Sequence, residues 1–316
     1  MEKIIEKIKD SQNIIVTAHI SEDADAIGST YAFAKALRNM GKNATVLLSD
    51  EPEDKLKFLK SEYIIFKKDM KFDADLVVFL DSADEGRLGD RKILKDKFPN
   101  VAIDHHYTNT MYADLSYVDG DASSTGELVY LFLKKMGAKI TKPIAECLYA
   151  AISGDTGSFK YSCTSPRTMR IAAELMETGI DHAEISRHIH EQEKIETVRL
   201  KGYLMSEIKS FYGGRLRLVT IDKKLFDRFG VSEKNAGDVV NIPRMVEGTE
   251  IAVSIRETEE KIKLSFRSNG KYNVSEVAAN FGGGGHVAAA GAAVFGTDLA
   301  EVEKKVIEVV GEIIND

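Results

Sequence analysis

Histidine and aspartate residues gather at four places in this sequence, three of which follow a short apolar run. They are His19, Asp23, Asp25, Asp81, Asp104, His105, His106 and Asp155. Imidazoles mixed with carboxylates, without thiolates, suit a hard or borderline divalent cation better than a structural zinc ion. The set holds more ligands than one ion needs, whereas two neighbouring ions that share a carboxylate would use them. Paired cations of this kind activate water for phosphoester hydrolysis, which is the chemistry that the set favours.

Each of these aspartates, taken singly, is better explained as a turn or capping residue. Because such residues occur together at three strand ends, we favour a binding site over three separate turns or caps. In an open α/β sheet the carboxyl ends of parallel strands form one edge, and ligands bind there. We therefore expect the groups that begin at His19, Asp81 and Asp104 to meet at that edge.

The apolar runs themselves predict a parallel sheet. Between about residues 13 and 113, short β-rich runs alternate with helical patterns, which is typical of an α/β fold with helices on both faces of the sheet. The predicted strands cover residues 14–18, 44–48, 76–80 and 101–103. A helix is predicted over residues 27–40, because its apolar residues have helical spacing and Gly41 can cap its C-terminus.

The rest of the chain divides into a helical stretch and a second domain. The pattern is helical from about residue 123 to residue 210. We expect a catalytic domain over residues 1–190, a helical connector over 191–210 and a smaller α+β domain over 211–316. In the last, strands are predicted at 215–221, 251–256 and 262–266, and helices at 274–280 and 298–314. A substrate-binding cleft between the two domains is the natural expectation.

Composition limits the class of protein. The length of 316 residues and the hydrophobic content of 43% allow two domains with separate cores. No segment has the roughly 18 uninterrupted apolar residues of a membrane span, and the N-terminus lacks the apolar stretch of a signal peptide, so we expect a cytoplasmic protein without a membrane partner. Cys147 and Cys163 form no Cys-x-x-Cys pair, which argues against a thiolate zinc site, and both are expected to be buried.

The charge of the chain limits its nucleic-acid partners. A net charge of −7 and a pI near 5.6 argue against a protein that coats long nucleic acid, because such binding neutralises many phosphates at once. A short RNA or a nucleotide remains compatible, since carboxylates reserved for cations also make the sum acidic.

A glycine run near the C-terminus is a second candidate site. Taken alone, glycine runs are most simply flexible loops. Beside the first set of residues we interpret this run as substrate-binding, because glycines let a backbone donate N–H groups to phosphate and an arginine can hold phosphate through two hydrogen bonds. The candidate substrate-binding residues are Arg267, Ser268, Gly283, Gly284, Gly285 and His286. Gly28 and Ser29 leave two interpretations open, an anion cradle or close helix packing.

These residues carry a resemblance to a known family. His19-x-x-x-Asp23-x-Asp25-Ala26-x-Gly28-Ser29, Asp81, Asp104-His105-His106 and Asp155 resemble the motifs of the DHH phosphoesterases. The segment 282–286, with 266–268 before it, resembles the DHHA1 domain that accompanies them. The resemblance spans nearly the whole chain and is strongest to the bifunctional oligoribonucleases and phosphatases of 3′-phosphoadenosine-5′-phosphate (pAp).

The resemblance implies a role for each residue. His19 and Asp23 would hold one ion, while Asp25, His105 and Asp155 would hold a second and Asp81 would bridge the two. His106 would face the scissile phosphate, and Asp104 would support the neighbouring imidazoles. The cofactor implied is a pair of Mn²⁺ ions, with Mg²⁺ or Co²⁺ as alternatives. The implied substrates are pAp and oligoribonucleotides of two to five nucleotides, and a homodimer is compatible.

Two positions depart from the family pattern. Glu22 and Ala24 stand where the family usually has proline and glycine. Ala24 restricts a turn that glycine would make freely, and Glu22 adds a carboxylate that would alter the affinity for cations.

Rival functions use the same residues. A phosphodiesterase for linear signalling dinucleotides such as pApA is the nearest, followed by an inorganic pyrophosphatase and a long-chain DNA exonuclease. A degenerate nucleotide-binding regulator without activity is the alternative from another class.

Overall fold

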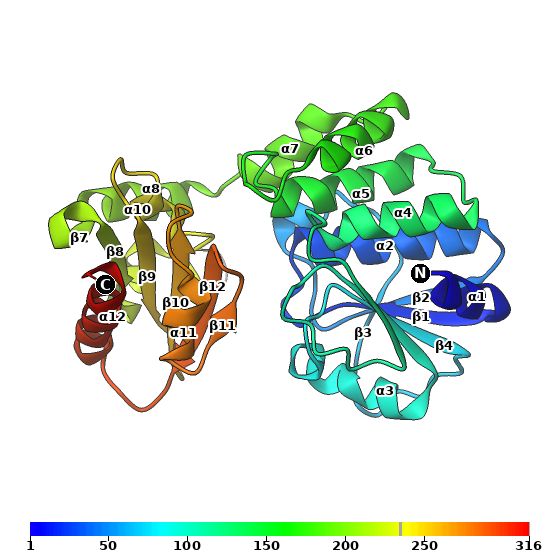
Figure 1. The fold of residues 1–316 in the computed structure, drawn as a ribbon, viewed down its shortest axis with the longest axis horizontal. Coiled ribbons are helices and arrows are strands. Elements are labelled where there is room, and N and C mark those ends of the chain that lie inside the picture. The colour runs from blue at the N-terminus through cyan, green and yellow to red at the C-terminus, as the bar shows by residue number, and fades with distance from the viewer. Residues whose placement is uncertain (234–235, 316) are drawn as a thin grey trace. The chain divides into compact units, whose positions relative to one another are not determined.

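The computed structural model describes residues 1–233 and 236–315, and the chain divides into two compact units, residues 1–192 and 193–316 (Figure 1). Each unit has its own six-stranded sheet and its own hydrophobic core. No helix in the described part of the chain is long and apolar enough to cross a membrane.

The sheet of the first unit is entirely parallel, with the strand order β3-β2-β1-β4-β5-β6. Its strands are β1 (Asn13–Thr17), β2 (Asn43–Leu48), β3 (Ile64–Ile65), β4 (Leu76–Leu80), β5 (Asn100–Asp104) and β6 (Leu115–Val118). The four strands predicted from sequence are confirmed. The edge strands β3 and β6 were missed: β3 is only two residues long and partly exposed, and β6 is half-buried and interrupted by Ser116.

Helices cover both faces of this sheet, as predicted. The helical segments are α1 (Glu2–Asp10), α2 (Ala24–Asn39), η1 (Asp54–Leu56), η2 (Glu85–Lys92), α3 (Ile93–Lys97), α4 (Thr125–Met136), α5 (Lys142–Asp155), α6 (Pro166–Glu177) and α7 (His182–His190). Side chains of a strand alternate between the faces. Ile14 and Val16 pack on the side of α1, α2, α4 and α5, whereas Ile15 packs on the side of η2 and α3.

The strand order places the candidate residues. The chain leaves β1 toward β2 on one side and returns to β4 on the other, so β1 and β4 flank the point where the order reverses. Ligands of open α/β sheets bind at the carboxyl ends of strands at such a point. His19 follows β1 and Asp81 follows β4, which brings them to the same place.

The helices α2 and α5 pack very closely. A Cβ atom at Gly28 would lie 2.4 Å from the carbonyl oxygen of Cys147, so the glycine is required by helix packing. This decides between the two interpretations of Gly28. Cys147 is buried as expected, but Cys163 is exposed, because it lies in the loop between α5 and α6 and outside the core.

The second unit has a mixed sheet with the order β11-β12-β10-β9-β8-β7, in which only β8 and β9 run parallel. Its strands are β7 (Lys209–Phe211), β8 (Leu216–Ile221), β9 (Ile251–Glu257), β10 (Ile262–Ser268), β11 (Gly284–Gly285) and β12 (Ala289–Val294). The helical segments are α8 (Ile195–Ser206), η3 (Tyr212–Gly214), α9 (Lys223–Phe229), α10 (Asn241–Arg244), α11 (Val274–Ala279) and α12 (Leu299–Asn315).

Three strands and two helices of this unit match the sequence prediction. The strands β7, β11 and β12 were missed; β12 is built of alanine, glycine and one valine, which are poor strand signals. Helix α8 lies within the stretch interpreted as a connector, and its Leu200 and Leu204 are fully buried against Val219 and Ile221 of β8. It therefore contributes to the core of the second unit.

Candidate metal centre

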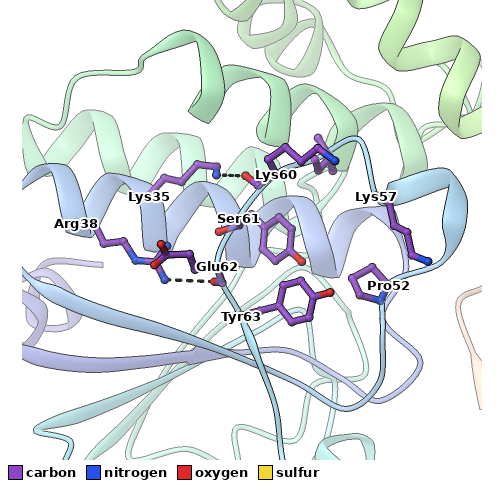
Figure 2. A pocket seen from close by; sticks show the side chains of 10 residues that line it. Lys35, Arg38, Pro52, Lys57, Lys60, Ser61, Glu62 and Tyr63 are labelled. Atoms are coloured by element: carbon purple, nitrogen blue, oxygen red, sulfur yellow. Dashed lines mark hydrogen bonds between the residues drawn. The ribbon is translucent and has the colours of Figure 1, made fainter.

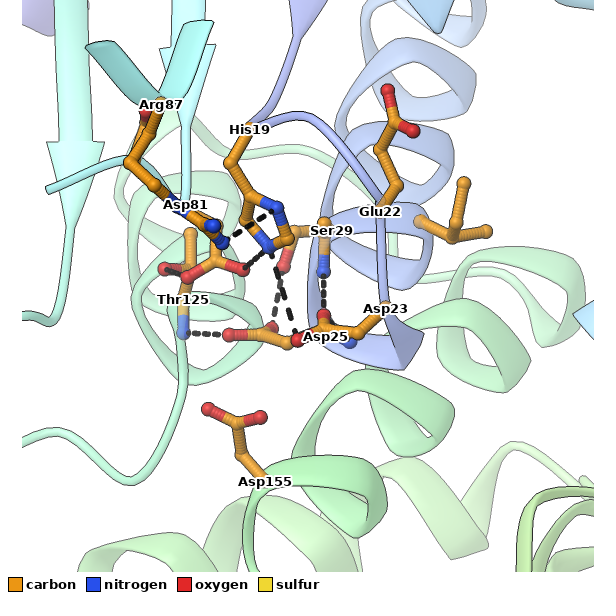
Figure 3. A network of polar contacts seen from close by, with 12 residues as sticks. His19, Glu22, Asp23, Asp25, Ser29, Asp81, Arg87, Thr125 and Asp155 are labelled. Carbon is orange, nitrogen blue, oxygen red and sulfur yellow. Dashed lines mark hydrogen bonds and ion pairs between the residues drawn. The ribbon is translucent and has the colours of Figure 1, made fainter. Parts of the chain in front are cut away.

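The candidate ligands of the first unit meet at the carboxyl edge of its sheet. Figure 3 shows His19, Asp23, Asp25, Asp81 and Asp155 turned toward a common centre. They come from the loops after β1 and β4, from the first turn of α2 and from the last residue of α5. These groups lie close together at one edge of the sheet, as expected from the strand ends.

His19 is buried and has a defined orientation. Its Nδ1 lies 2.7 Å from the carbonyl oxygen of Ile20, so Nδ1 carries the proton and donates it there. The other nitrogen, Nε2, lies 3.4 Å from Oδ2 of Asp81 and 3.8 Å from Oδ2 of Asp23. Nε2 is therefore the nitrogen of this ring that could bind a cation, since a backbone acceptor fixes the tautomer.

Asp81 lies at the middle of the cluster. One oxygen, Oδ2, faces His19, while Oδ1 lies 3.6 Å from Nε2 of His105 and accepts a 3.0 Å hydrogen bond from Oγ1 of Thr125. Its backbone has a φ of 53°, a left-handed conformation that is costly for a residue other than glycine. The two oxygens of one carboxylate thus face two different groups of ligands.

Asp25 is held by the N-terminus of α4. Its Oδ2 accepts from the backbone N–H of Thr125 at 2.6 Å, and its Oδ1 accepts from the N–H of Gly126 at 2.8 Å and from Oγ of Ser29 at 2.9 Å. A Cβ atom at Gly126 would lie 2.5 Å from the Cβ atom of Ala151. Ser29 therefore orients the carboxylate of Asp25. Its hydroxyl is engaged by this contact, so Ser29 is not the anion cradle that was one of the two interpretations.

The pair of histidines after β5 has two environments. Nε2 of His105 lies 3.2 Å from Oδ2 of Asp155 and 3.9 Å from Oδ2 of Asp25. Nδ1 of His106 donates to Oδ1 of Asp104 at 2.7 Å, and the other oxygen of Asp104 accepts from Nδ2 of Asn109, also at 2.7 Å. Asp104 is thus occupied in orienting His106.

Burial and the close charges of the cluster shift the pKa values of its residues. Burial opposes the charged imidazole of His19, but the carboxylates of Asp23 and Asp81 outweigh it and raise the pKa of His19 well above its ordinary value of 6.5. Burial, with the nearby charges of Asp81 and Asp155, raises the pKa of Asp25 well above 3.8. Burial would also raise the pKa of Asp81, but the three imidazoles, His19 first, hold it well below 3.8.

This donor set fits divalent cations. The atoms of His19, Asp23 and Asp81 lie within 4.8 Å of one another, and so do those of Asp25, Asp81 and His105. The two groups share Asp81. Buried carboxylates that repel one another, together with imidazole nitrogens and no sulfur, suit an oxygen- and nitrogen-seeking divalent ion.

Glu22 does not join the cluster, contrary to the expectation that it would add a carboxylate there. Its Oε1 accepts from Nη1 of Arg91 at 2.6 Å and from the N–H of Ser49 at 2.7 Å, and its Oε2 accepts from Oγ of Ser49 at 2.6 Å. The charge of Glu22 is therefore compensated by a buried guanidinium. Ala24 is the first residue of α2, and the left-handed turn lies at Ser21, with a φ of 58°, so the alanine restricts nothing.

The candidate substrate-binding residues of the second unit lie in β10, in β11 and directly next to β11. Arg267 reaches Asp238, with Nη2 3.2 Å from Oδ2, and Oγ of Ser268 accepts from the N–H groups of Gly270 and Tyr272, both at 3.2 Å. Ser268 is almost fully buried, so its hydroxyl stabilises a turn.

The glycines of this loop differ from one another. A Cβ atom at Gly283 would lie 2.1 Å from the carbonyl oxygen of Gly291, and one at Gly285 would lie 2.6 Å from that of Ala289. Both are therefore required by the close approach of β12. Gly284 has open space around it, and the N–H of His286 donates to the carbonyl oxygen of Ala289 at 2.7 Å.

A pocket of about 640 Å³ lies elsewhere in the first unit, between α2 and the loop before β3 (Figure 2). Two of its basic side chains are already engaged: Nζ of Lys35 donates to the carbonyl of Lys60, and Arg38 donates to those of Ala44 and Glu62. These cations hold the loop on α2, which explains their position without a ligand.

Sequence reasoning missed the residues that orient the ligands. The partners of Asp81, Asp104 and Glu22 were not among the candidate residues predicted from the sequence; they are Thr125, Asn109, Arg91 and Ser49. The run Ser123-Ser124-Thr125 at the start of α4 is a signal that could have pointed to such a role, because it is typical of a helix N-terminus, which attracts carboxylates.

Comparison with known proteins places this site in context. Residues 13–152 match the DHH family, N-terminal domain, and residues 218–316 match the DHHA1 domain. The bifunctional oligoribonuclease and PAP phosphatase NrnA of Thermus thermophilus is 34% identical over 301 residues, which cover 95% of this chain and 89% of that protein. The Bacillus subtilis protein of the same name is 30% identical over 307 residues, with 95% of each chain covered. The crystal structure of an exopolyphosphatase-related protein from Bacteroides fragilis has a TM-score of 0.92 at 27% identity and covers 100% of this chain and 97% of its own.

Proposed function

This chain belongs to the DHH family of phosphoesterases and carries a DHHA1 domain, and on this premise we propose that it hydrolyses short oligoribonucleotides to mononucleotides and removes a phosphate from pAp. The two NrnA relatives are named for these activities and match 95% of the chain. The family supports phosphoester hydrolysis, and the shared coverage of both units supports the substrates.

One observation carries the proposal within the site. The two oxygens of Asp81 face different histidines, His19 at 3.4 Å and His105 at 3.6 Å. A carboxylate placed in this way can serve two cations at once. Burial and the charges of neighbouring carboxylates raise the pKa of Asp25, and together with this shift the arrangement favours a pair of ions over a single one.

We assign His19 and Asp23 to one ion, Asp25, His105 and Asp155 to the other, and Asp81 to both. Mn²⁺ suits these imidazoles and carboxylates, and Mg²⁺ or Co²⁺ are alternatives. When bound, such ions polarise the phosphate and lower the pKa of a water molecule that attacks it.

The remaining candidate residues orient the site or bind the substrate. Asp104 accepts from the Nδ1–H of His106 and orients its ring, and we assign this ring to the substrate phosphate. We assign substrate binding in the DHHA1 domain to Arg267, His286 and the open backbone at Gly284, whereas Ser268, Gly283 and Gly285 maintain the shape of that region.

The test is product formation by the purified protein with Mn²⁺. The substrates are pAp, pApA, pyrophosphate and end-labelled RNAs of two, five and about two dozen nucleotides, with His105→Ala as the inactive control. We expect mononucleotides from the short RNAs and AMP from pAp, and none of either from the control. If pApA or pyrophosphate is hydrolysed faster than short RNA and pAp, it becomes the proposed substrate in their place. If no substrate is hydrolysed, a nucleotide-binding regulator is favoured.

A further inference from the structure

Arg87 lies in η2, the segment that follows Asp81, and its backbone is fixed to the loop that carries His19. The N–H of Ile20 donates to the carbonyl oxygen of Arg87 at 2.8 Å. Gly89 allows the two segments to touch, since a Cβ atom there would lie 2.5 Å from Cγ2 of Ile20. The backbone that carries the guanidinium is therefore joined to the loop that carries His19.

The guanidinium lies beside the imidazole of His19 (Figure 3). Nη2 of Arg87 is 3.2 Å from Nδ1 of His19, and the same Nδ1 is 2.7 Å from the carbonyl oxygen of Ile20. A carbonyl oxygen only accepts, so Nδ1 must be the donor in the shorter contact. Because Nδ1 carries a hydrogen, it cannot accept one from Arg87, and the 3.2 Å contact is packing.

No counter-charge accompanies Arg87. Among the residues that the structure describes, no carboxylate oxygen lies within 4.0 Å of its guanidinium nitrogens, and the residue is exposed. Arg91, four residues further along η2, is neutralised by Glu22. Arg87 is thus a cation held at the edge of an acidic cluster and open to solvent on its outer side.

We propose that Arg87 binds a phosphate oxygen of the substrate next to His19; this rests on the function proposed above. A phosphate that approaches Asp23 and Asp81 is repelled by their carboxylates, and a positively charged side chain at the same edge offsets the repulsion. A guanidinium is suited to the task, because its planar N–H groups form charge-assisted hydrogen bonds with phosphate oxygens.

The test compares Arg87→Met with Arg87→Lys, which keeps the charge, and with Lys92→Met, which removes an exposed cation from the same segment. Binding of inorganic phosphate and of AMP to the Mn²⁺-loaded proteins is measured by calorimetry, and kcat and KM are measured with pAp. We expect Arg87→Met to weaken phosphate and AMP binding about 10- to 100-fold, the usual effect of losing a hydrogen bond to a charged group. Arg87→Lys should recover part of the loss, and Lys92→Met should bind as the wild type does.

The affinity for Mn²⁺ itself separates binding from support of His19. Equal Mn²⁺ affinity in all four proteins is expected, whereas a loss in Arg87→Met would mean that Arg87 acts through His19 and would overturn the proposal. Wild-type affinity of Arg87→Met for both anions, or no binding of either by the wild type, would also overturn it. A wild type that binds AMP but hydrolyses nothing would refute the proposed function and leave the role of Arg87 to be judged from binding.

Discussion

Oε1 of Glu22 lies 2.6 Å from Nη1 of Arg91, and the two side chains are 3% and 1% exposed. Ser49 completes the contacts by donating its N–H and its hydroxyl to the two oxygens of Glu22. The residue that precedes the candidate ligand Asp23 is in this way attached both to the end of β2 and to η2. This buried pair positions the first ligand loop without taking part in the cluster.

We expect Glu22→Ala to lower the free energy of unfolding by about 3–5 kcal/mol, because it leaves the guanidinium of Arg91 buried without a counter-charge, with the carbonyl oxygen of Leu47 still accepting from it. Glu22→Gln should lose less, since an amide oxygen still accepts from Arg91 and Ser49. Urea unfolding in EDTA measures both. Glu53→Ala removes an exposed partner of Lys55 and serves as the control. Equal stability of Glu22→Ala and wild type would mean that the pair does not hold the loop.

Asp104→Asn should lower kcat on pAp by about 10- to 100-fold, the usual effect of removing a carboxylate that orients an imidazole at a metal site. The reason is that Asp104 holds Nδ1 of His106 at 2.7 Å. Steady-state kinetics with Mn²⁺ measures the change. The control is Asp121→Asn, which changes an exposed carboxylate that accepts from Tyr107; its kcat should equal that of the wild type. Full activity of Asp104→Asn would show that the charge of Asp104 is not needed to orient His106.

The stabilisation of the protein by Mn²⁺ should increase with pH. Ion pairs raise the pKa of His105 despite its burial, so their contribution to stability is complete below its ordinary pKa of 6.5 and is lost as the pH rises through the raised value. Burial and neighbouring charges raise the pKa of Asp25, so the unfolded chain releases this proton more readily than the fold does, and the fold loses stability as the pH rises above 3.8. Both effects weaken the cation-free protein at higher pH, and a bound cation reverses them.

The difference in Tm between Mn²⁺ and EDTA, followed from about pH 6 to about pH 8, measures this effect. His105→Ala is the control, because it removes both a ligand and one of the titrating groups. A difference in Tm that is constant or decreases over this range would contradict the competition between protons and cations.

Gly28→Ala should destabilise the first unit by about 1–3 kcal/mol, the range observed for overpacking. The added methyl would lie 2.4 Å from the backbone oxygen of Cys147 and 2.9 Å from the Cβ atom of Ala151. Gly202→Ala, in the helix α8 with open space around it, should instead be neutral or stabilising by up to about 1 kcal/mol. Thermal unfolding compares them. Similar behaviour of the two variants would show that α2 and α5 adjust easily.

Much of the first unit follows from its sequence. The central strands are recognisable because parallel strands buried on both faces form continuous apolar runs, such as Leu76–Leu80. The candidate ligands are recognisable because they follow those runs and consist of residue types that bind cations. In the second unit β12 has neither signal, since it consists of four alanines, one glycine and one valine and pairs with β10 and β11.

The sequence by itself determined which residues gather, because the carboxyl ends of neighbouring parallel strands must share one edge. Only the tertiary structure decided what each side chain does there. Asp25 is held by N–H groups 100 and 101 positions away, and Glu22 is neutralised by an arginine 69 positions away. Such partners depend on the order of the strands and on how closely α2, α4 and η2 approach them, and local residue patterns carry no record of either.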